Sequence, residues 1–459
     1  MLTRLARGRL RAACAAGLLT WLTACGLTLP LRAQGIVGAQ GDAGWQAQDE
    51  LAPGGWDEFD DLGYGSSCGG TCGCGDACCD TCCDGSHMQD CDWFCCGPYT
   101  GGQHWWFGGE LLLWRVSGTH LPALVTDSPA ALPPTLNLST TNVLAGGDVT
   151  GNSWRSGYRL ELGVWFDDCQ ELALIGDYFN AGENDYDYFF PGSSGRNTGR
   201  PYFDTENGIA SVRLISVPGE LDGTIAITAD DDFQSAGLAI QQRVYAVGDT
   251  SGYGTSTQVM VLGGYRFFSY DSQLSIRDHR VDTNGAGMGD QDFRRDMFTT
   301  DNEFHGGEIG VMTRFTQTGC WFDGLFKLAI GGHKKRATVN GAAATIPNGM
   351  PVEFEDGGLL TSSLTNIGTY TDSRVRIIPT FRFGFGAYLT PQWTFQAGYT
   401  AVAWSGVARA GGLTPPNLAV DPRNVPPVMA GGGTAPVFQG LGGSKLVAHG
   451  LDLGIEYRY

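Results

Sequence analysis

From residue 103 to the last residue, the chain is a series of stretches in which apolar and polar residues alternate. In the final stretch, Leu451, Leu453 and Ile455 occupy every second position. Asp452 and Glu456 occupy intervening positions. Because successive side chains of a β-strand point to opposite faces, this period of two predicts strands with one apolar and one polar face.

The number and length of these stretches predict an all-β chain of about twelve strands. Several are long enough to cross a bilayer, because a tilted membrane strand needs about 9–11 residues. The predicted strands are 103–115, 155–166, 171–180, 208–216, 232–247, 256–270, 272–279, 304–316, 321–333, 374–389, 393–404 and 445–459.

The links between the predicted strands are largely short and long in turn. The short, turn-like links are Asp167–Gln170, Asp271, Gln317–Cys320 and Thr390–Gln392. The long links, rich in Gly, Pro, Asn and Thr, are 116–154, 181–207, 280–303, 334–373 and 405–444. This alternation is typical of an up-and-down antiparallel barrel with tight turns at one rim and long loops at the other. An even strand number places both barrel ends at the short-turn rim, and the long loops could fold inward and plug the bore.

Periodicity alone does not say which face points outward, so a water-soluble barrel or sandwich is the alternative to a transmembrane barrel. The polar face carries too many charges for a small dry core, which favours a polar lumen inside a lipid-facing apolar surface. We expect the lumen to be lined by Arg159, Glu161, Arg266, Arg314, Arg382, Glu456 and Arg458. Aromatic residues near strand ends predict interfacial girdles; they are Trp105, Trp106, Trp114, Trp154, Trp165, Trp321, Trp393, Trp404 and Tyr459.

Residues 1–33 predict a secretory signal peptide. Residues 1–11 contain four Arg and no acid, and residues 12–31 are uncharged and mostly apolar or small. Ala33 supplies the small residue at which cleavage is expected. A membrane anchor is one alternative, since twenty uncharged residues are long enough to span a bilayer. Lipidation at Cys25 is another, because Leu22-Thr23-Ala24-Cys25 fits a lipobox.

Residues 34–102 form a Gly- and Asp-rich linker that holds ten of the 14 cysteines. Because it has little apolar surface to bury, we do not expect it to fold by hydrophobic burial. Disulfides, within the chain or to other envelope proteins, are the default in an exported protein. A thiolate metal cluster and a disordered tether are the alternatives. The ten are Cys68, Cys72, Cys74, Cys78, Cys79, Cys82, Cys83, Cys91, Cys95 and Cys96.

Two further cysteines, Cys169 and Cys320, fall at tight turns of the same predicted rim. They are a candidate disulfide provided that their Cα atoms lie within about 7 Å. The alternative is a pair of thiols.

Composition excludes several other classes of protein. Gly makes up 70 of the 459 residues and charged residues are only 17%, with no clean long helix, which argues against a helical bundle and a nucleotide-binding α/β enzyme. The net charge of −19 argues against nucleic acid as a partner, because phosphate binding needs a basic face.

No motif predicts catalysis, a cofactor or a metal. The chain contains neither His-Glu-x-x-His nor a phosphate loop ending in Gly-Lys-Ser or Gly-Lys-Thr. Asp230, Asp231 and Asp232 have the charge to attract a cation, but a solvated acidic turn is the favoured explanation. His305, His333 and His449 are scattered and are expected at the rim or in the lumen. We therefore expect a protein that is not an enzyme.

Several short sequences, in this order, resemble the beta-barrel porin 7 family of planctomycete bacteria. The resemblance covers about 103–459 and implies an outer-membrane barrel with a transport role; it implies no enzymatic activity, and the Cys-rich linker lies outside it. The matching sequences are Trp106-Phe107-Gly108-Gly109-Glu110-Leu111-Leu112-Leu113-Trp114, Leu121-Pro122-Ala123-Leu124-Val125-Thr126, Arg155-Ser156-Gly157-Tyr158-Arg159, Gly163-Val164-Trp165-Phe166-Asp167, Leu262-Gly263-Gly264-Tyr265-Arg266-Phe267 and His449-Gly450-Leu451-Asp452-Leu453-Gly454-Ile455-Glu456-Tyr457-Arg458-Tyr459.

Two functions compete at this point. The favoured one is a passive channel for small hydrophilic solutes, with a lumen narrower than that of 16–18-stranded porins. The second is a structural barrel that anchors a cross-linking Cys-rich arm. For both we expect an outer-membrane location, a periplasmic arm, lipid as a partner, and insertion by the barrel-assembly machinery through the strand that ends at Tyr459.

Overall fold

The computed structural model describes residues 104–167, 170–192, 195–248, 254–285, 287–348, 350–429 and 432–459. These residues are almost all in β-strands or loops. The described helices are short 3-10 turns: η1 (Ala410–Leu413), η2 (Pro416–Leu418) and η3 (Pro422–Asn424). Within the described part of the chain, no helix has the length and apolar character to cross a bilayer.

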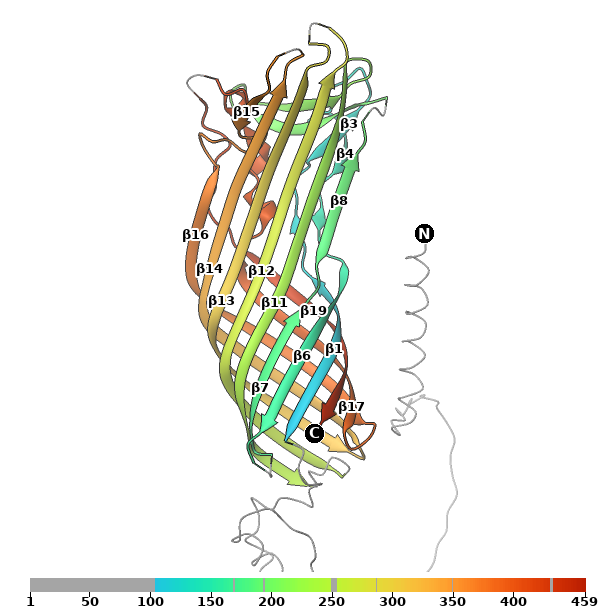
Figure 1. Ribbon diagram of the computed structural model, residues 1–459, viewed down its shortest axis with the longest axis vertical. Coiled ribbons are helices and arrows are strands. Elements are labelled where there is room, and N and C mark those ends of the chain that lie inside the picture. Colours follow the sequence, from blue (N-terminus) through green and yellow to red (C-terminus); the bar gives the residue numbers. More distant parts are fainter. Residues whose placement is uncertain are drawn as a thin grey trace, which may run out of the picture. The chain divides into compact units, whose positions relative to one another are not determined.

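Ten antiparallel strands hydrogen-bond to one another in a closed ring (Figure 1). In ring order they are β1 (Trp105–Val116), β6 (Trp154–Trp165), β7 (Leu172–Asn180), β11 (Leu221–Gly248), β12 (Ser256–Asp282), β13 (Gln291–Gln317), β14 (Cys320–Ile346), β16 (Gly368–Tyr388), β17 (Trp393–Val407) and β19 (Ser444–Arg458). Pairing of β19 with β1 closes the ring. Two further strands, β8 (Asn184–Phe190) on β11 and β15 (Glu353–Asp356) on β14, complete a twelve-stranded sheet. The predicted antiparallel barrel of about twelve strands is confirmed.

Both ends of the ring meet at the rim with the tight turns. The amide of Trp105 donates to the carbonyl of Tyr459 at 3.0 Å, and the C-terminus lies at the lower rim in Figure 1. The turn between β13 and β14 and the turn after Tyr388 lie at the same rim. This arrangement follows from the even number of strands.

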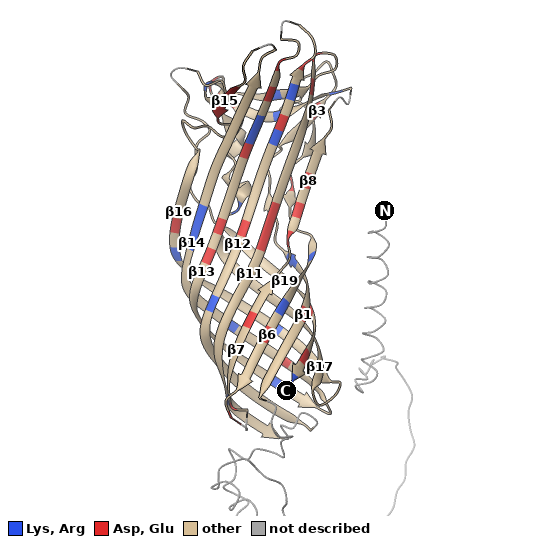
Figure 2. Cartoon of the chain, in the orientation of Figure 1, with Lys and Arg blue, Asp and Glu red and all other residues tan. Residues whose placement is uncertain are grey.

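The outer face of the lower wall is apolar. On β14, Phe322, Phe326 and Ile330 point outward and are exposed, whereas Lys334 and Arg336 continue the same face above them. The change from apolar to charged residues marks the upper limit of the surface suited to lipid. Figure 2 shows charged residues both in the upper part of the tall wall and lower in the barrel.

The wall is much taller on one side than on the other. Strands β11 to β14 have 27 or 28 residues, whereas β1, β6, β17 and β19 have 12 to 15. A membrane strand needs only about 9–11 residues, so the tall strands project beyond the lipid. Two predictions were wrong here. Large parts of 280–303 and 334–373 are paired strand rather than loop, and Asp271 is not a turn but lies within β12, paired on both sides.

A smaller inner sheet fills the space beside the tall wall. Its strands are β10 (Ile209–Ser216), β9 (Asn197–Asp204), β3 (Val125–Ser128), β4 (Asn142–Ala145) and β18 (Ala419–Val420), and a separate pair joins β2 (Thr119–His120) to β5 (Val149–Thr150). The prediction that 208–216 is a barrel strand was therefore wrong, because β10 pairs with β9 of the inner sheet and its Ile215 is buried in the core that the inner sheet shares with the wall.

The inner sheet is held to the wall by apolar packing and by buried ion pairs. Arg200 of β9 binds Asp278 at 2.7 Å and Asp296 at 2.6 Å, and Arg213 of β10 binds Asp278 at 3.0 Å. Loop residues such as Leu418 join the same core. The long loops thus fold inward. The core comprises Leu121, Leu124, Val125, Ala145, Phe190, Ile215, Ile225, Ile227, Leu274, Ile276, Phe298, Ala337, Val339, Leu359, Leu360, Ala410, Leu413, Leu418 and Val420.

Two tryptophans near the short-turn rim each cover a glycine directly opposite on the neighbouring strand. Trp106 of β1 pairs with Gly163 of β6, and Trp321 of β14 pairs with Gly386 of β16. A Cβ atom on Gly163 would lie 1.9 Å from the ring of Trp106, and one on Gly386 would lie 2.1 Å from the ring of Trp321. These positions need glycine because the indole occupies the space of the side chain.

We expect Gly163→Val to lower the free energy of unfolding by about 1–3 kcal/mol, since overpacking forces the indole out of its position. The measurement is the temperature at which the barrel loses its fast-migrating form on a semi-native gel. Gly109→Val is the matched control, because nothing lies within 4 Å of a Cβ there. Equal shifts in the two variants would contradict the packing argument.

Three carboxylates lie directly opposite one another on the outer face above the apolar surface. Asp271 of β12 pairs with Asp232 of β11 on one side and with Asp301 of β13 on the other. Like charges in this arrangement destabilise a sheet. Partial burial, Asp301 and Asp232 together raise the pKa of Asp271 to about 6, against the weaker opposing effect of a hydrogen bond from Ser269.

We expect Asp271→Asn to stabilise the barrel at neutral pH but not in acid. An unfolded Asp has a pKa of about 3.9, so the folded chain binds the extra proton between that value and about 6. Proton binding at Asp271 therefore stabilises the folded chain fully below about pH 4, and this stabilisation is lost as the pH rises through 6. The gain should be below about 1 kcal/mol because the group is partly solvated. Urea midpoints at about pH 7.5 and about pH 4 measure it; equal gains at both pH values would refute the charge argument.

Candidate functional site: the bore of the barrel

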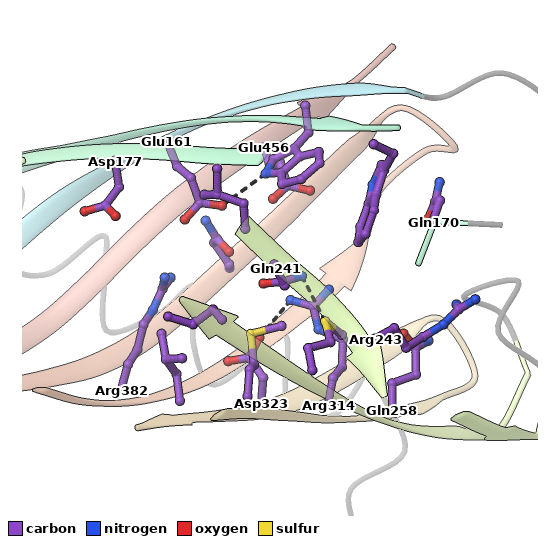
Figure 3. Close-up of a pocket in the computed structure, with 18 of the residues that line it drawn as sticks. Glu161, Gln170, Asp177, Gln241, Arg243, Gln258, Arg314, Asp323, Arg382 and Glu456 are labelled. Atoms are coloured by element: carbon purple, nitrogen blue, oxygen red, sulfur yellow. Dashed lines mark hydrogen bonds and ion pairs between the residues drawn. The ribbon is translucent and has the colours of Figure 1, made fainter. Parts of the chain in front are cut away.

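A polar cavity of about 140 Å³ lies inside the barrel next to the short-turn rim. Figure 3 shows Glu161, Arg314 and Arg382 among the labelled residues that line it. Its walls come from most strands of the ring, because every second side chain of each strand points into the bore. Aromatic rings of Trp105, Trp106, Trp165 and Tyr388 complete the lining.

The charged groups of this cavity are already paired. Arg314 binds Asp323 at 3.0 Å and Arg458 binds Glu456 at 2.7 Å. The carboxylate of Glu161 accepts a hydrogen bond of 3.1 Å from Nε1 of Trp106. The guanidinium of Arg314 also lies over the ring of Trp321 at 5.2 Å, a cation–π contact. The cavity is thus polar but has a rigid lining.

Deeper in the bore, Glu110 of β1 collects donors from three other strands. Arg159 donates to it at 2.5 Å, Gln396 donates at 2.9 Å, and Arg382 forms an ion pair with it. Arg159 also binds Asp452 at 3.5 Å. Four elements distant in sequence are therefore tied together by one buried carboxylate.

A second network lies on the other side of the bore, on β7, β12, β13 and β14. The guanidinium of Arg266 binds Asp177 through two hydrogen bonds of 2.5 and 2.8 Å, and Glu308 through two of 2.8 Å. Lys327 adds a bond to Glu308 at 3.2 Å. A Cβ atom on Gly237 would lie 2.4 Å from the guanidinium carbon, so glycine makes room for the cation. Such paired geometry is what a buried charge requires.

A cluster of buried aromatic rings lies in the bore above these networks. Trp404 lies 6.1 Å from Phe268 and 6.3 Å from Phe304, ring centre to ring centre, and Phe233 stacks on Phe268 at 6.1 Å. The side chains are fully or almost fully buried. We define the septum as Trp114, Phe179, Phe233, Phe268, Phe304 and Trp404.

The septum also corrects the predicted girdle. Trp106, Trp114, Trp321 and Trp404 point into the bore and are buried, and Trp165 lines the cavity, so the assignment of these five to the lipid interface was wrong. They occupy the inward parity of their strands, which position near a strand end does not reveal. Trp105, Trp154, Trp393 and Tyr459 are exposed.

The seven side chains predicted for the lumen all lie on the inner face. Arg159 and Arg266 belong to the buried networks, and the other five line the cavity. The predicted lumen set does not contain Glu110, Asp177, Lys327 and Asp452. Asp452 was placed on the polar face of its strand but was not assigned to the lumen. The other three occupy the same parity as the inward residues of their strands, but each is a single charge among apolar or glycine neighbours.

The remaining candidate residues have other positions. Cys320 lies at the start of β14, at the short-turn rim; Cys169 and the ten linker cysteines fall outside the described residues. His305 and His449 lie on the outer face, where Nδ1 of each shares a hydrogen bond with a tyrosine, Tyr265 at 2.5 Å and Tyr399 at 2.6 Å. Among the described residues, no three His, Cys, Asp or Glu side chains are grouped to hold a metal.

A closed ring with an apolar outside and paired charges inside is the architecture of an outer-membrane barrel. The family described as "Putative beta barrel porin-7 (BBP7)" matches residues 106–459. The chain belongs to this family. The predicted family resemblance is confirmed, and the match begins at the first strand of the barrel.

Solved structures give only distant similarity to this porin-family barrel. The outer membrane protease OmpT from Escherichia coli is 9% identical, with a TM-score of 0.34, covering 78% of this chain and 97% of that one. A FadL homologue from Pseudomonas aeruginosa is 9% identical, with a TM-score of 0.19 and coverage of 77% and 90%. The toluene transporter TbuX from Ralstonia pickettii is 9% identical, with a TM-score of 0.15 and coverage of 78% and 90%. A comparison with curated proteins found no match to this chain.

We expect Arg266→Met to lower the free energy of unfolding by about 3–5 kcal/mol, because it removes four hydrogen bonds to buried carboxylates and leaves Lys327 to neutralise both Asp177 and Glu308. Urea unfolding in detergent micelles measures this. Arg277→Met on the same strand is the control, since Arg277 is exposed on the outer face. A loss below about 1 kcal/mol in Arg266→Met would show that Lys327 or water, not the guanidinium, compensates the two carboxylates.

Proposed function

We propose that this chain is a non-conducting structural barrel of the outer membrane. The observation that carries the proposal is the septum. A pore for hydrophilic solutes needs a continuous polar path, whereas a layer of buried aromatic rings offers few groups that could replace a solute's hydration shell.

The filling above the septum supports the same function. A water-filled pore is the rule at 16–18 strands, whereas about eight strands leave a bore that side chains fill. The ring of ten strands is near the filled limit. The inner sheet and segment 408–429 then occupy the space beside the tall wall, and Arg409 fixes that segment through a 2.5 Å hydrogen bond to the carbonyl of Ser117.

In this proposal the barrel serves as an anchor. Outer-membrane lipid surrounds its apolar face, the assembly machinery inserts it through β19, and the Cys-rich segment cross-links to envelope proteins from the periplasmic side. The proposal includes no catalysis. The expected evidence for cross-linking is a ladder of bands on non-reducing gels that collapses on reduction.

A passive channel for small hydrophilic solutes is the second candidate, and the cavity favours it. Its polar lining next to the short-turn rim matches what such a solute needs over the first part of a path. Passage would then require the septum and the segment anchored by Arg409 to move. Family membership is consistent with both functions.

Conductance in a planar bilayer separates the two candidates. We expect the wild-type barrel to give no current steps, because the septum excludes ions. The double variant Phe268→Ala with Phe304→Ala removes two septum rings and should produce steps or a leak current. Steps from the wild-type protein would overturn the structural proposal in favour of the channel.

The control removes aromatic rings without touching the bore. Phe326→Ala with Phe383→Ala deletes two exposed rings of the outer face and should stay silent. Heat-modifiable mobility on gels verifies that both variants are folded. If both double variants leak equally, the current comes from a damaged barrel and not from the septum.

A further inference from the structure

The ring of hydrogen bonds has a seam above the apolar surface, between β16 and β17. The two strands pair only from Thr380 to Tyr388 on β16. Above Thr380, β16 pairs with β14 alone, while residues 403–407 of β17 pair with β19 alone. The outward residues Val375 and Ile377 beside the seam are exposed. The seam therefore lies where the lipid-facing surface ends.

Arg376 leans into this seam from the inner face of β16. A Cβ atom on Gly406 would lie 2.8 Å from Nε and Nη2 of Arg376, so the guanidinium takes the place of a side chain there. Gly406 has a φ of +81° in an irregular stretch of β17, which glycine adopts without strain. Nε of Arg376 is buried and has no hydrogen-bond partner, and no carboxylate of the described residues forms an ion pair with it.

Two more buried donor groups lie beside the seam. The imidazole of His333 packs against the indole of Trp404, with ring centres 4.8 Å apart. His333 is 1% exposed and Trp404 is fully buried. Both ring nitrogens of His333 lack a hydrogen-bond partner, and so does Nε1 of Trp404. Buried polar groups are normally paired, so these groups point to an unassigned ligand.

The charge around the seam is positive. Lys335 and Arg374 share one carboxylate, Asp372, at 3.2 and 3.0 Å. Lys335 is buried, whereas the side chain of Arg374 is 62% exposed. Together with Arg376, three cations are matched by one acid. Figure 2 shows basic residues on β14 and β16 on this side of the wall.

We propose that the seam binds a phosphate-class oxyanion. Arg376 supplies a charged donor for it, the indole N–H of Trp404 and the imidazole of His333 supply neutral ones, and Arg374 lies at the solvent side as the first contact. Guanidinium donors suit a phosphate because their planar geometry matches two of its oxygens. The phosphate comes either from solution or from a lipid headgroup, since the seam lies at the end of the lipid-facing surface.

The test is calorimetric titration of the full chain in neutral detergent micelles with inorganic phosphate. We expect saturable binding, weakened at least tenfold in Arg376→Gln. Trp404→Phe replaces the indole by a smaller aromatic ring and deletes the donor, so it should weaken binding even if the arginine variant fails to fold. Arg336→Gln, on the outer face of β14, is the control and should bind as the wild type does.

A second arm identifies the source of the phosphate. The barrel is reconstituted in phosphatidylcholine vesicles with or without phosphatidylglycerol, and the retained lipid is measured after extraction. Selective retention of phosphatidylglycerol, lost in Arg376→Gln, assigns the site to a headgroup; phosphate binding without such retention assigns it to a free anion. The proposal is overturned if the wild type shows neither, or if Arg376→Gln and Trp404→Phe behave like the wild type in both arms.

Discussion

The structure depends on one constraint: in lipid, every backbone N–H and C=O must find its partner within the sheet. The pairing of β19 with β1 meets it by removing the free edges. Because the ring is closed, every second side chain of each strand points into a narrow bore. Charged side chains in that bore lose water, so each must meet an opposite charge. The networks centred on Glu110 and Arg266 follow directly from this requirement.

The same constraint no longer applies above the lipid, and the architecture changes there. Only the tall strands β11 to β14 and their neighbours continue above the lipid. This part of the sheet has free edges on β8 and on the upper part of β16. Water satisfies exposed backbone groups at this level, so the chain can use unpaired edges. The space that the missing half of the wall leaves is filled by the inner sheet, which buried ion pairs at Arg200 fix in place.

Function follows from what the bore contains rather than from the barrel itself. Family membership places the chain among porin-type barrels, yet a fold hosts many functions and the site must decide. Here a paired polar cavity is followed by a dry aromatic layer. The first is compatible with a solute path, and in the function that we propose the second interrupts it. The seam at Arg376 adds a different use of the wall, as a place where an anion meets unpaired donors at the end of the lipid-facing surface.

The sequence by itself determined the all-β class, the parity of the wall and the inward placement of residues such as Arg159 and Glu456, because a period of two is a local property of the strand. It did not reveal that Asp271 lies inside a continuous strand or that 208–216 belongs to the inner sheet and not to the barrel wall. The same pattern of polar and apolar residues occurs in a turn, in a solvated extension of a strand and in an inner sheet. Nor did it distinguish Trp404 in the septum from Trp393 on the surface. Those choices depend on which segments meet across the bore, and only the closed tertiary structure brings β12, β13 and β17 close enough to make them.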